Sequence, residues 1–300
     1  MQKGIVMELL PQVILDGIMI GSIYITIAIG FSLVFGVMHI IDFAVGEWIM
    51  LGAFLGYYLN RWSGLDPFLF LPFIFIIFFG LGYLLQPVIQ RVISGHRGNP
   101  LLMGLVFTFG LMLIIRGLGL TIFGFYSRSI PTAMAATSFV FEKGNFFLTI
   151  PLVRLCGLLF AVVITLVLYY VLKRTDFGTG VRALAQNRES AGLMGVNSKR
   201  TNCYVYGIYV GISAMTGVLI GCIFSITAME GGRFTLVAFF IVVLAGMGYL
   251  PGVPWAAFVL GLVQSFFIVY ISASYTLLAM FAMLYFILLV SPKGLFGKGW

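Results

Sequence analysis

Three ionisable residues stand inside or beside long apolar runs, where a charge is costly. Asp42 and Glu47 flank a short Phe-Ala-Val-Gly segment, and Arg116 lies within the apolar stretch 101–125. Ionisable side chains at membrane depth usually serve a function, because burying them in lipid costs free energy. Arg116 either lines a polar pathway, where it can meet a carboxylate, or extends toward the nearer interface. Asp42 and Glu47, together with His39, either line an inner gate or cap the helix that follows them.

Catalytic and metal-binding chemistry has little support in the sequence. His39 and His96 are the only histidines and fall in different loops, which argues against a metal site or a His-based triad. No nucleophile–base pair stands at one depth of the apolar stretches. The three cysteines, whose spacing matches no disulfide or metal pattern, are expected to pack as small apolar residues: Cys156, Cys203 and Cys222.

The composition explains why these charges stand out. Hydrophobic residues make up 61% of the 300 residues and charged residues only 9%, and the mean hydropathy is +1.13. Soluble domains carry about 25% charged residues, so this chain has too few polar side chains to cover a surface in water. The net charge of +8 lies between apolar runs rather than in a solvated domain, which argues against nucleic-acid binding.

The apolar runs predict a single all-α, polytopic membrane domain covering residues 1–300. A spanning helix needs about 20 mostly apolar residues, and the pattern predicts eight or nine crossings, with nine favoured. Two of the nine are short and interrupted at their flanks by Gly or Pro, so either is broken, re-entrant or strongly tilted. The predicted spans are 10–36, 44–60, 67–90, 101–125, 152–172, 204–228, 234–250, 254–271 and 274–291.

Glycine pairs four residues apart recur in these spans and predict close helix packing, because both members of a pair share one helix face. The pairs are Gly17 and Gly21, Gly52 and Gly56, Gly207 and Gly211, and Gly217 and Gly221.

Basic residues predict the orientation, because cytoplasmic loops are enriched in Lys and Arg. One orientation places the larger group of bases inside: Arg91, Arg97, Lys173, Arg174, Arg182, Arg188, Lys199, Arg200, Lys293 and Lys298. The smaller group then lies outside or at the outer rim: Lys3, Arg61, Arg128, Lys143, Arg154 and Arg233. This orientation gives an external N-terminus and a cytoplasmic C-terminus in the membrane.

The longest polar stretch, residues 173–202, has features of two short helices. Thr179 is placed to cap a first helix over Val181–Gln186, and Asn187 is placed to cap a second. Glu189 falls in the first turn of the second helix, and Gly195 suits the position just after its end. A helix lying on anionic lipid would use both the bases and the apolar residues of this stretch, and so would a helix docked in a groove of a partner protein. A plain solvated loop is the third possibility.

Three segments, in order, resemble permeases of the branched-chain amino acid type of ABC importer. The first is 21–53, which contains GSIYITIAIG, FGV, IDFAVGE and MLGA. The second is 174–197, RTDFGTGVRALAQNRESAGLMGVN, and the third is 243–252, VLAGMGYLPG. The segments follow the family's order and are spread over nearly the whole chain, from residue 21 to residue 252.

The resemblance implies a type II importer fold and a set of partners. Two permeases, usually non-identical, form the pathway across the bacterial inner membrane; two cytoplasmic ATPases drive it, and a periplasmic binding protein delivers the amino acid. No G-x-x-x-x-G-K-[ST] phosphate loop occurs in the sequence, so ATP and any cofactor would belong to other subunits. The resemblance also implies that 173–202 couples to the ATPases, through residues Arg182, Asn187, Arg188, Glu189, Ser190, Leu193, Met194 and Gly195.

The sequence departs from the family pattern where a gate is expected. Asp42 replaces the family's usual Asn, and Val45 replaces its usual His. An added carboxylate there leaves a cationic amino acid, an amide or a urea-like solute open as substrate, beside a branched-chain amino acid. A secondary transporter would need intramembrane ionisable groups, and only Arg116 clearly qualifies. Glu230-Gly-Gly-Arg233, in a predicted outer turn, either contacts a binding protein or is a plain charged turn.

Overall fold

The computed structural model describes residues 2–94, 100–143 and 146–296. His96, Arg97 and Lys298, which entered the sequence analysis, lie outside these residues. The described elements are α1 (Gln2–Met38), α2 (Val45–Ser63), η1 (Pro67–Phe70), α3 (Leu71–Ser94), α4 (Pro100–Phe123), η2 (Ala133–Ala136), β1 (Ser138–Lys143), β2 (Phe146–Pro151), α5 (Leu152–Arg174), α6 (Asp176–Gln186), α7 (Arg188–Leu193), α8 (Ser198–Ile223), α9 (Gly231–Ala245), η3 (Leu250–Gly252), α10 (Val253–Tyr270), η4 (Ala273–Tyr275) and α11 (Thr276–Val290).

Each predicted span corresponds to a helix, but not every helix is long enough to cross a bilayer. Within the described residues, seven helical stretches are long and apolar enough to span: α1, η1 with α3, α4, α5, α8, η3 with α10, and η4 with α11. At 15 residues, α9 is about 22 Å long, which is less than the roughly 30 Å of a hydrocarbon core. The two stretches that the sequence marked as short are α2 and α9, the two apolar helices that do not qualify as full spans.

α1 and α8 form the centre of the bundle. In an apolar 18-residue window of each helix, 89% and 83% of the residues are buried, against 22% in the corresponding windows of α3, α4, α5 and α11. A helix that is apolar on all sides must be covered on all sides by protein or lipid. The outer helices expose large apolar side chains such as Leu84, Val106 and Phe286, which suit contact with lipid tails or another apolar surface.

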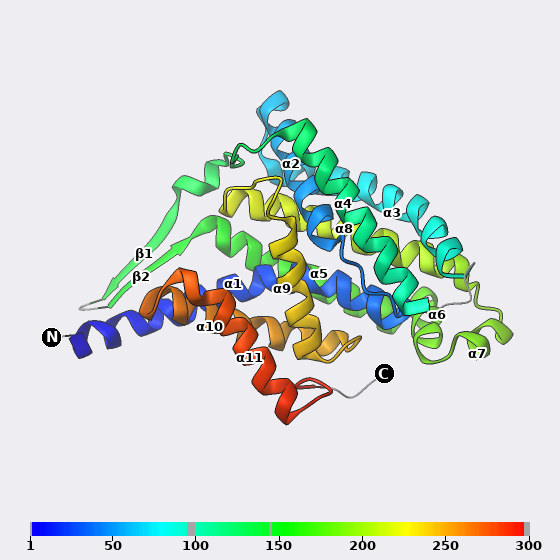
Figure 1. Ribbon diagram of the computed structural model, residues 1–300. Helices are drawn as coiled ribbons and strands as arrows, with labels where there is room; N and C mark the ends of the chain where they lie inside the picture. The colour runs from blue at the N-terminus through cyan, green and yellow to red at the C-terminus, as the bar shows by residue number, and fades with distance from the viewer. Residues whose placement is uncertain (1, 95–99, 144–145, 297–300) are drawn as a thin grey trace.

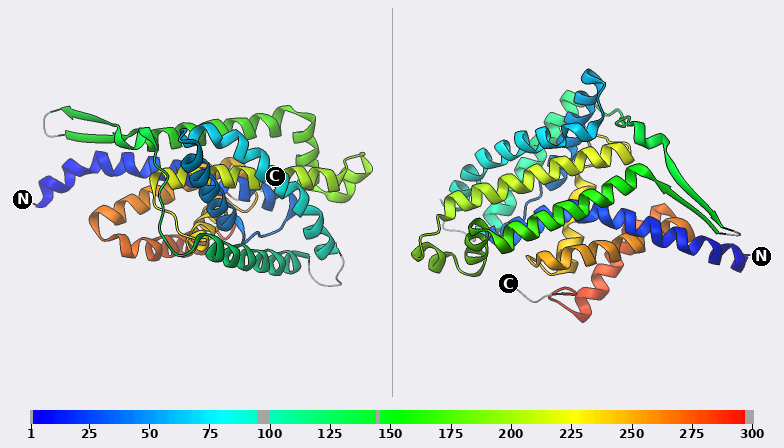
Figure 2. Two further views of the ribbon diagram at one scale, coloured as in Figure 1. Left: turned by 90° about the horizontal axis from the view of Figure 1, so that it is seen from above. Right: turned by 180° about the vertical axis from the view of Figure 1, so that it is seen from behind.

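Different elements lie at the two ends of the bundle (Figure 1). The N-terminus and the β1–β2 hairpin lie at one end, and α6 and α7 lie at the other; the view from behind in Figure 2 shows the same separation. The hairpin is antiparallel, with Ser138 opposite Pro151. The sequence analysis did not predict this hairpin.

Glycines let the central helices approach closely, as their spacing predicted. An added Cβ at Gly17 would lie 2.9 Å from the Leu262 backbone of α10, and one at Gly21 would lie 2.9 Å from the Phe258 backbone. On the other side of the bundle, Gly52 of α2 packs on the backbone of Ala214 in α8, and Gly217 of α8 packs on the Ile49 carbonyl. The neighbours here are backbone atoms, which cannot move aside as a flexible side chain can.

We predict that Gly52→Ala destabilises the bundle and that Gly110→Ala does not. The added methyl at Gly52 collides with the α8 backbone. A methyl added at Gly110 in α4 would meet no described atom outside its own helix within 4 Å. Overpacking of this kind costs about 1–3 kcal/mol, while Gly→Ala in an open helix position is neutral or stabilising. Thermal unfolding of the purified protein in detergent measures both; equal midpoints for the two variants would contradict the close crossing.

Candidate functional site

A non-helical segment, residues 39–44, crosses from the end of α1 to the start of α2; it is called the crossing segment below. It begins at His39, whose φ of +53° is the only positive value at a non-glycine position among the described residues. Ile40, Asp42 and Ala44 are buried. Backbone that is neither helix nor sheet must find hydrogen-bond partners inside the protein when no water is near.

Two threonines from distant helices supply those partners. Thr108 of α4 donates to the Ile41 carbonyl at 2.9 Å and accepts from the Phe43 amide at 3.3 Å. Thr235 of α9 donates to the Phe43 carbonyl at 3.1 Å and accepts from the Gly46 amide at 3.1 Å. Both side chains are buried, so each replaces water for this backbone.

Asp42 is fully buried and its two oxygens are both engaged. One accepts from the Tyr206 hydroxyl of α8 at 2.7 Å, and the other accepts from the Ala44 amide at 2.8 Å. The helix that follows has Ala44 as its N-cap residue, with no side-chain cap. Asp42 therefore holds the crossing segment against α8 rather than capping α2.

Glu47 and Arg116 meet in a buried ion pair between α2 and α4. The Glu47 Oε1 accepts from Arg116 Nη2 at 2.6 Å and from Nε at 2.9 Å. Glu47 has no exposed side-chain surface and Arg116 keeps 26% of its own. Arg116 therefore does not extend to a membrane interface, and Glu47 does not cap α2. The two side chains pair with each other instead.

The ion pair sits against the first turn of α9. A Cβ at Gly231 would lie 2.5 Å from the Glu47 carboxylate, and one at Gly232 would lie 2.8 Å from Arg116 Nη2. The glycine doublet thus lets the α9 backbone lie directly on both charges. The amide end of a helix carries partial positive charge, which favours a carboxylate beside it. Glu47, Arg116 and α9 form one unit, while Asp42 belongs to a separate contact with α8.

The segment after α5 folds as two short helices, and its second half matches the sequence prediction. Asn187 accepts from the Glu189 amide at 2.9 Å and from the Ser190 amide at 3.1 Å, so it caps α7. Gly195 has a φ of +87° just beyond the end of α7, a conformation that favours glycine. Leu193 and Met194 are 91% and 88% exposed, so an apolar tip projects from this end.

The predicted cap of the first short helix is wrong. α6 begins at Asp176, five residues before the predicted Val181, and Thr175 is its cap, accepting from the Gly178 amide at 3.1 Å. Gly178 packs against the Leu172 carbonyl at the end of α5, where any Cβ would collide. That tight approach lets α6 start directly after α5, a fact that Thr179 and its neighbours do not signal.

Arg188 links α7 to the crossing segment. Its Nη2 donates to the carbonyl of Met38, the last residue of α1, at 2.8 Å. His39 follows at once, and the buried contacts of Asp42 come three residues later. A direct hydrogen bond therefore connects α7 to the residue that precedes the crossing segment.

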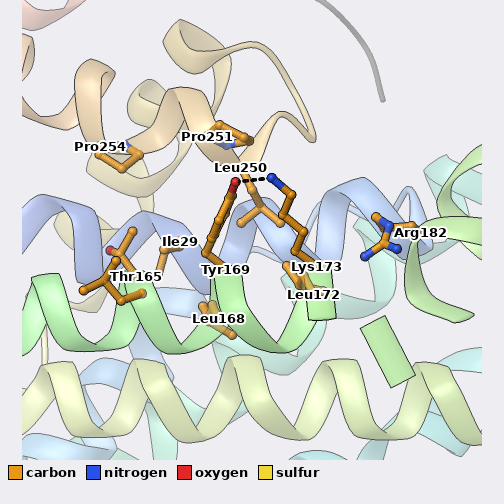
Figure 3. Close-up of a pocket in the computed structure, with 11 residues that line it drawn as sticks. Ile29, Thr165, Leu168, Tyr169, Leu172, Lys173, Arg182, Leu250, Pro251 and Pro254 are labelled. Carbon is orange, nitrogen blue, oxygen red and sulfur yellow. Dashed lines mark hydrogen bonds between the residues drawn. The ribbon is translucent and has the colours of Figure 1, made fainter. Parts of the chain in front are cut away.

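A second predicted residue of this loop, Arg182, lies beside a cavity of about 660 Å³ between α1, α5, η3 and α10 (Figure 3). Its lining is mainly apolar, and Lys173 at its rim donates to the Tyr169 hydroxyl at 2.7 Å. The Arg182 Nη1 is buried without a hydrogen-bond partner among the described residues. Arg182 is therefore set apart from the exposed α7 tip.

Tyr206, Thr108 and Thr235 were not singled out by the sequence analysis. Each stands in an apolar helix far along the chain from the crossing segment, and each is buried. A lone polar residue in such a helix is a weak signal, since Thr also bonds to its own helix; Thr235 does so with the Gly231 carbonyl.

Comparison with known proteins gives one family. Residues 13–288 match the family model described as branched-chain amino acid transport system / permease component. The chain is 27% identical to the high-affinity branched-chain amino acid transport system permease protein LivH of Salmonella typhimurium, over 96% of this chain and 95% of the relative. It is 27% identical to BraD of Pseudomonas aeruginosa, with the same coverage, and 24% identical to the probable LivH of Methanocaldococcus jannaschii, over 100% and 97%. No solved structure matches.

We predict that Arg116→Met destabilises the protein more than the double variant Glu47→Gln/Arg116→Met. The single change leaves a buried carboxylate without its partner, which costs about 3–5 kcal/mol, whereas removing both charges relieves most of that cost. Thermal unfolding of the purified variants measures the difference.

The matched control is Arg154→Met, which breaks the 2.7 Å pair with Asp16; those side chains are 28% and 23% exposed. Pairs in contact with water contribute about 0–1 kcal/mol, so a small effect is expected. A double variant at least as unstable as Arg116→Met would mean that Glu47 is not held as a buried charge by Arg116.

Proposed function

This chain belongs to the branched-chain amino acid permease family of ABC transport systems, and from that membership we propose a specific division of labour. The chain is a transport subunit and not an enzyme. It forms one side of a transmembrane pathway, paired with a second and non-identical permease, while two separate ATPase subunits hydrolyse ATP and a periplasmic binding protein delivers the solute. The observation that carries this proposal is the pairing of an exposed apolar tip on α7 with a direct hydrogen bond from α7 to the end of α1.

The exposed tip suits a partner groove better than a lipid surface. Leu193 and Met194 project beyond the capped turn, and Glu189 is exposed next to them. A carboxylate at that position is repelled by anionic lipid but is accepted by a protein groove with a matching charge. We therefore assign residues Asn187–Gly195 to the ATPase contact and place this end of the bundle in the cytoplasm.

The orientation follows from that assignment. α1 ends beside α7, so its N-terminal end lies outside, and the clusters of Lys and Arg around α6 and α7 lie inside, in agreement with the positive-inside tendency. The β1–β2 hairpin then faces the periplasm.

A branched-chain or related aliphatic amino acid is the substrate that we propose. The relatives are named for branched-chain amino acids. Asp42 raised a cationic, amide or urea-like solute as alternatives, but its carboxylate is buried and occupied by Tyr206 and Ala44. A carboxylate in that state has no free oxygen facing a pathway, so its presence gives no reason to prefer a cation.

The coupling route is short. ATPase motion that displaces α7 acts on Met38 through Arg188, and the crossing segment passes that motion to α4, α8 and α9 through Thr108, Tyr206 and Thr235. α9 in turn rests on the Glu47–Arg116 pair. Every step is a contact between packed or hydrogen-bonded groups, so no flexible linker dissipates the displacement.

Uptake of labelled leucine into vesicles is expected to require ATP and the partner ATPases. Vesicles lacking the ATPase subunits should take up no solute on an imposed ion gradient. Uptake that persists on the gradient alone would identify a secondary transporter and refute the proposal.

Arg188→Ala and Glu189→Ala should each lower the ATPase stimulation by loaded binding protein several-fold, while the affinity for the binding protein stays unchanged. Arg188→Ala removes the contact with Met38, and Glu189→Ala removes a charge from the exposed tip. Lys199→Ala is the control, because Lys199 is an exposed base at the same end of the bundle. Unchanged stimulation in both test variants would favour a helix lying on lipid.

A further inference from the structure

A second cavity lies between α1, α8, α9 and α10. Its volume is about 180 Å³, and residues of the turn from α8 to α9, among them Ser225 and Glu230, line it together with the middle of α1. Pockets for drug-sized ligands are typically about 300–1,000 Å³. A cavity of this size therefore suits a single small molecule and excludes a peptide or a sugar chain. It is called the α9 cavity below.

Two opposite charges line the α9 cavity without neutralising each other. Glu230 and Arg233 both face it, yet no ion pair within 4.0 Å involves either residue among those that the structure describes. Glu230 precedes α9 but its side chain makes no capping hydrogen bond. Burial raises the pKa of the Glu230 carboxyl, and the nearby Arg233 charge opposes that rise. Two charges that are close, opposite and unpaired can be satisfied together by one dipolar ligand.

The deeper wall combines an aliphatic surface with one polar pair. Ile20, Ile23, Ile27 and Val237 line the cavity from α1 and α9. Tyr24 and Gln264, only 8% and 7% exposed, are hydrogen-bonded to each other through the tyrosine hydroxyl and the Gln264 Oε1. The Gln264 carbonyl is thereby occupied, and its amide nitrogen has no hydrogen-bond partner among the described residues.

We infer that the α9 cavity binds one α-amino acid zwitterion with an aliphatic side chain. Its carboxylate faces Arg233, its ammonium group faces Glu230, and its side chain lies against Ile20, Ile23 and Val237. This inference rests on the proposed function and adds a place within this chain where the substrate is held after release from its delivery protein.

The charge pattern discriminates against other small solutes. A simple anion is attracted by Arg233 but repelled by Glu230. A simple cation is attracted by Glu230 but repelled by Arg233. A neutral amide or urea gains neither charge contact and leaves the half-buried Glu230 carboxylate without a partner, whereas the exposed Arg233 can remain hydrated. A zwitterion satisfies both, and the aliphatic wall favours a branched apolar side chain over a polar one.

The test uses the complete transporter, with both permeases and both ATPases, in detergent and without binding protein. Equilibrium binding of labelled L-leucine is competed by three probes: unlabelled leucine, isoamylamine, which lacks the carboxylate, and 4-methylpentanoate, which lacks the ammonium group. In the unaltered protein each analogue should bind about tenfold to a hundredfold more weakly than leucine, because each loses one hydrogen-bonded charge contact.

Each charge variant should abolish the preference for leucine over one of the two analogues. In Arg233→Gln, leucine should weaken by about tenfold to a hundredfold and isoamylamine should compete as well as leucine. In Glu230→Gln, 4-methylpentanoate should compete as well as leucine. Arg61→Gln, which alters an exposed arginine in the last turn of α2, should leave all three affinities unchanged.

The outcomes separate this inference from the proposed function. ATP-dependent leucine uptake by the unaltered transporter tests the function, and the analogue ranking tests the cavity. Uptake without direct leucine binding, or an unchanged ranking in both charge variants, would each overturn the cavity assignment and leave the function standing. A variant that loses all three ligands equally has lost its fold rather than one charge contact, and the ranking in the other charge variant then decides.

Discussion

The Glu47–Arg116 pair is the constraint on which the interior of the bundle depends. Glu47 lies in the first turn of α2 with no exposed side-chain surface, and only the Arg116 guanidinium bonds to its carboxylate within the described residues. A buried charge that loses its partner is far more costly than a pair removed together. α2, α4 and α9 must therefore keep their positions relative to one another, because the first turn of α9 has two glycines where any side chain would strike the pair. The position of α9 in turn sets one wall of the α9 cavity.

The crossing segment leads directly to this pair. Its six residues, 39–44, separate the end of α1 from the start of α2, whose first turn carries Glu47. The chain covers that gap without helical hydrogen bonds, which a membrane protein tolerates only where other side chains supply the missing partners. Thr108, Thr235 and Asp42 provide contacts of that kind, and each joins the segment to a different helix. A stretch that looks like a loop in the sequence thus ties α4, α8 and α9 to the connection between α1 and α2.

Local signals predicted local structure well. Nine apolar stretches gave nine helices, the short ones were α2 and α9, and Asn187 and Gly195 bound α7 as expected. Thr179 misled because Thr175, four residues earlier, has the same side chain and the extended backbone of a cap. The hairpin at 138–151 was not predicted. Local sequence patterns do not show which distant residues come into contact. Glu47 and Arg116 are 69 positions apart, and Asp42 and Tyr206 are 164 apart. Both carboxylates were recognised as unusual, but their partners depend on which helices become neighbours.

The length of α1 has a consequence for the end of the bundle that carries the β1–β2 hairpin. Its 37 residues make a rod of about 55 Å, against a hydrocarbon layer of roughly 30 Å. Gln12 exchanges two hydrogen bonds with Thr149 of the hairpin, and Asp16 pairs with Arg154, so the rod is braced sideways near its start. The α9 cavity begins at Ile20, one turn farther in. The start of α1 and the β1–β2 hairpin therefore extend beyond the α9 cavity along α1. A protein that docks on this end contacts the hairpin before it comes near the cavity.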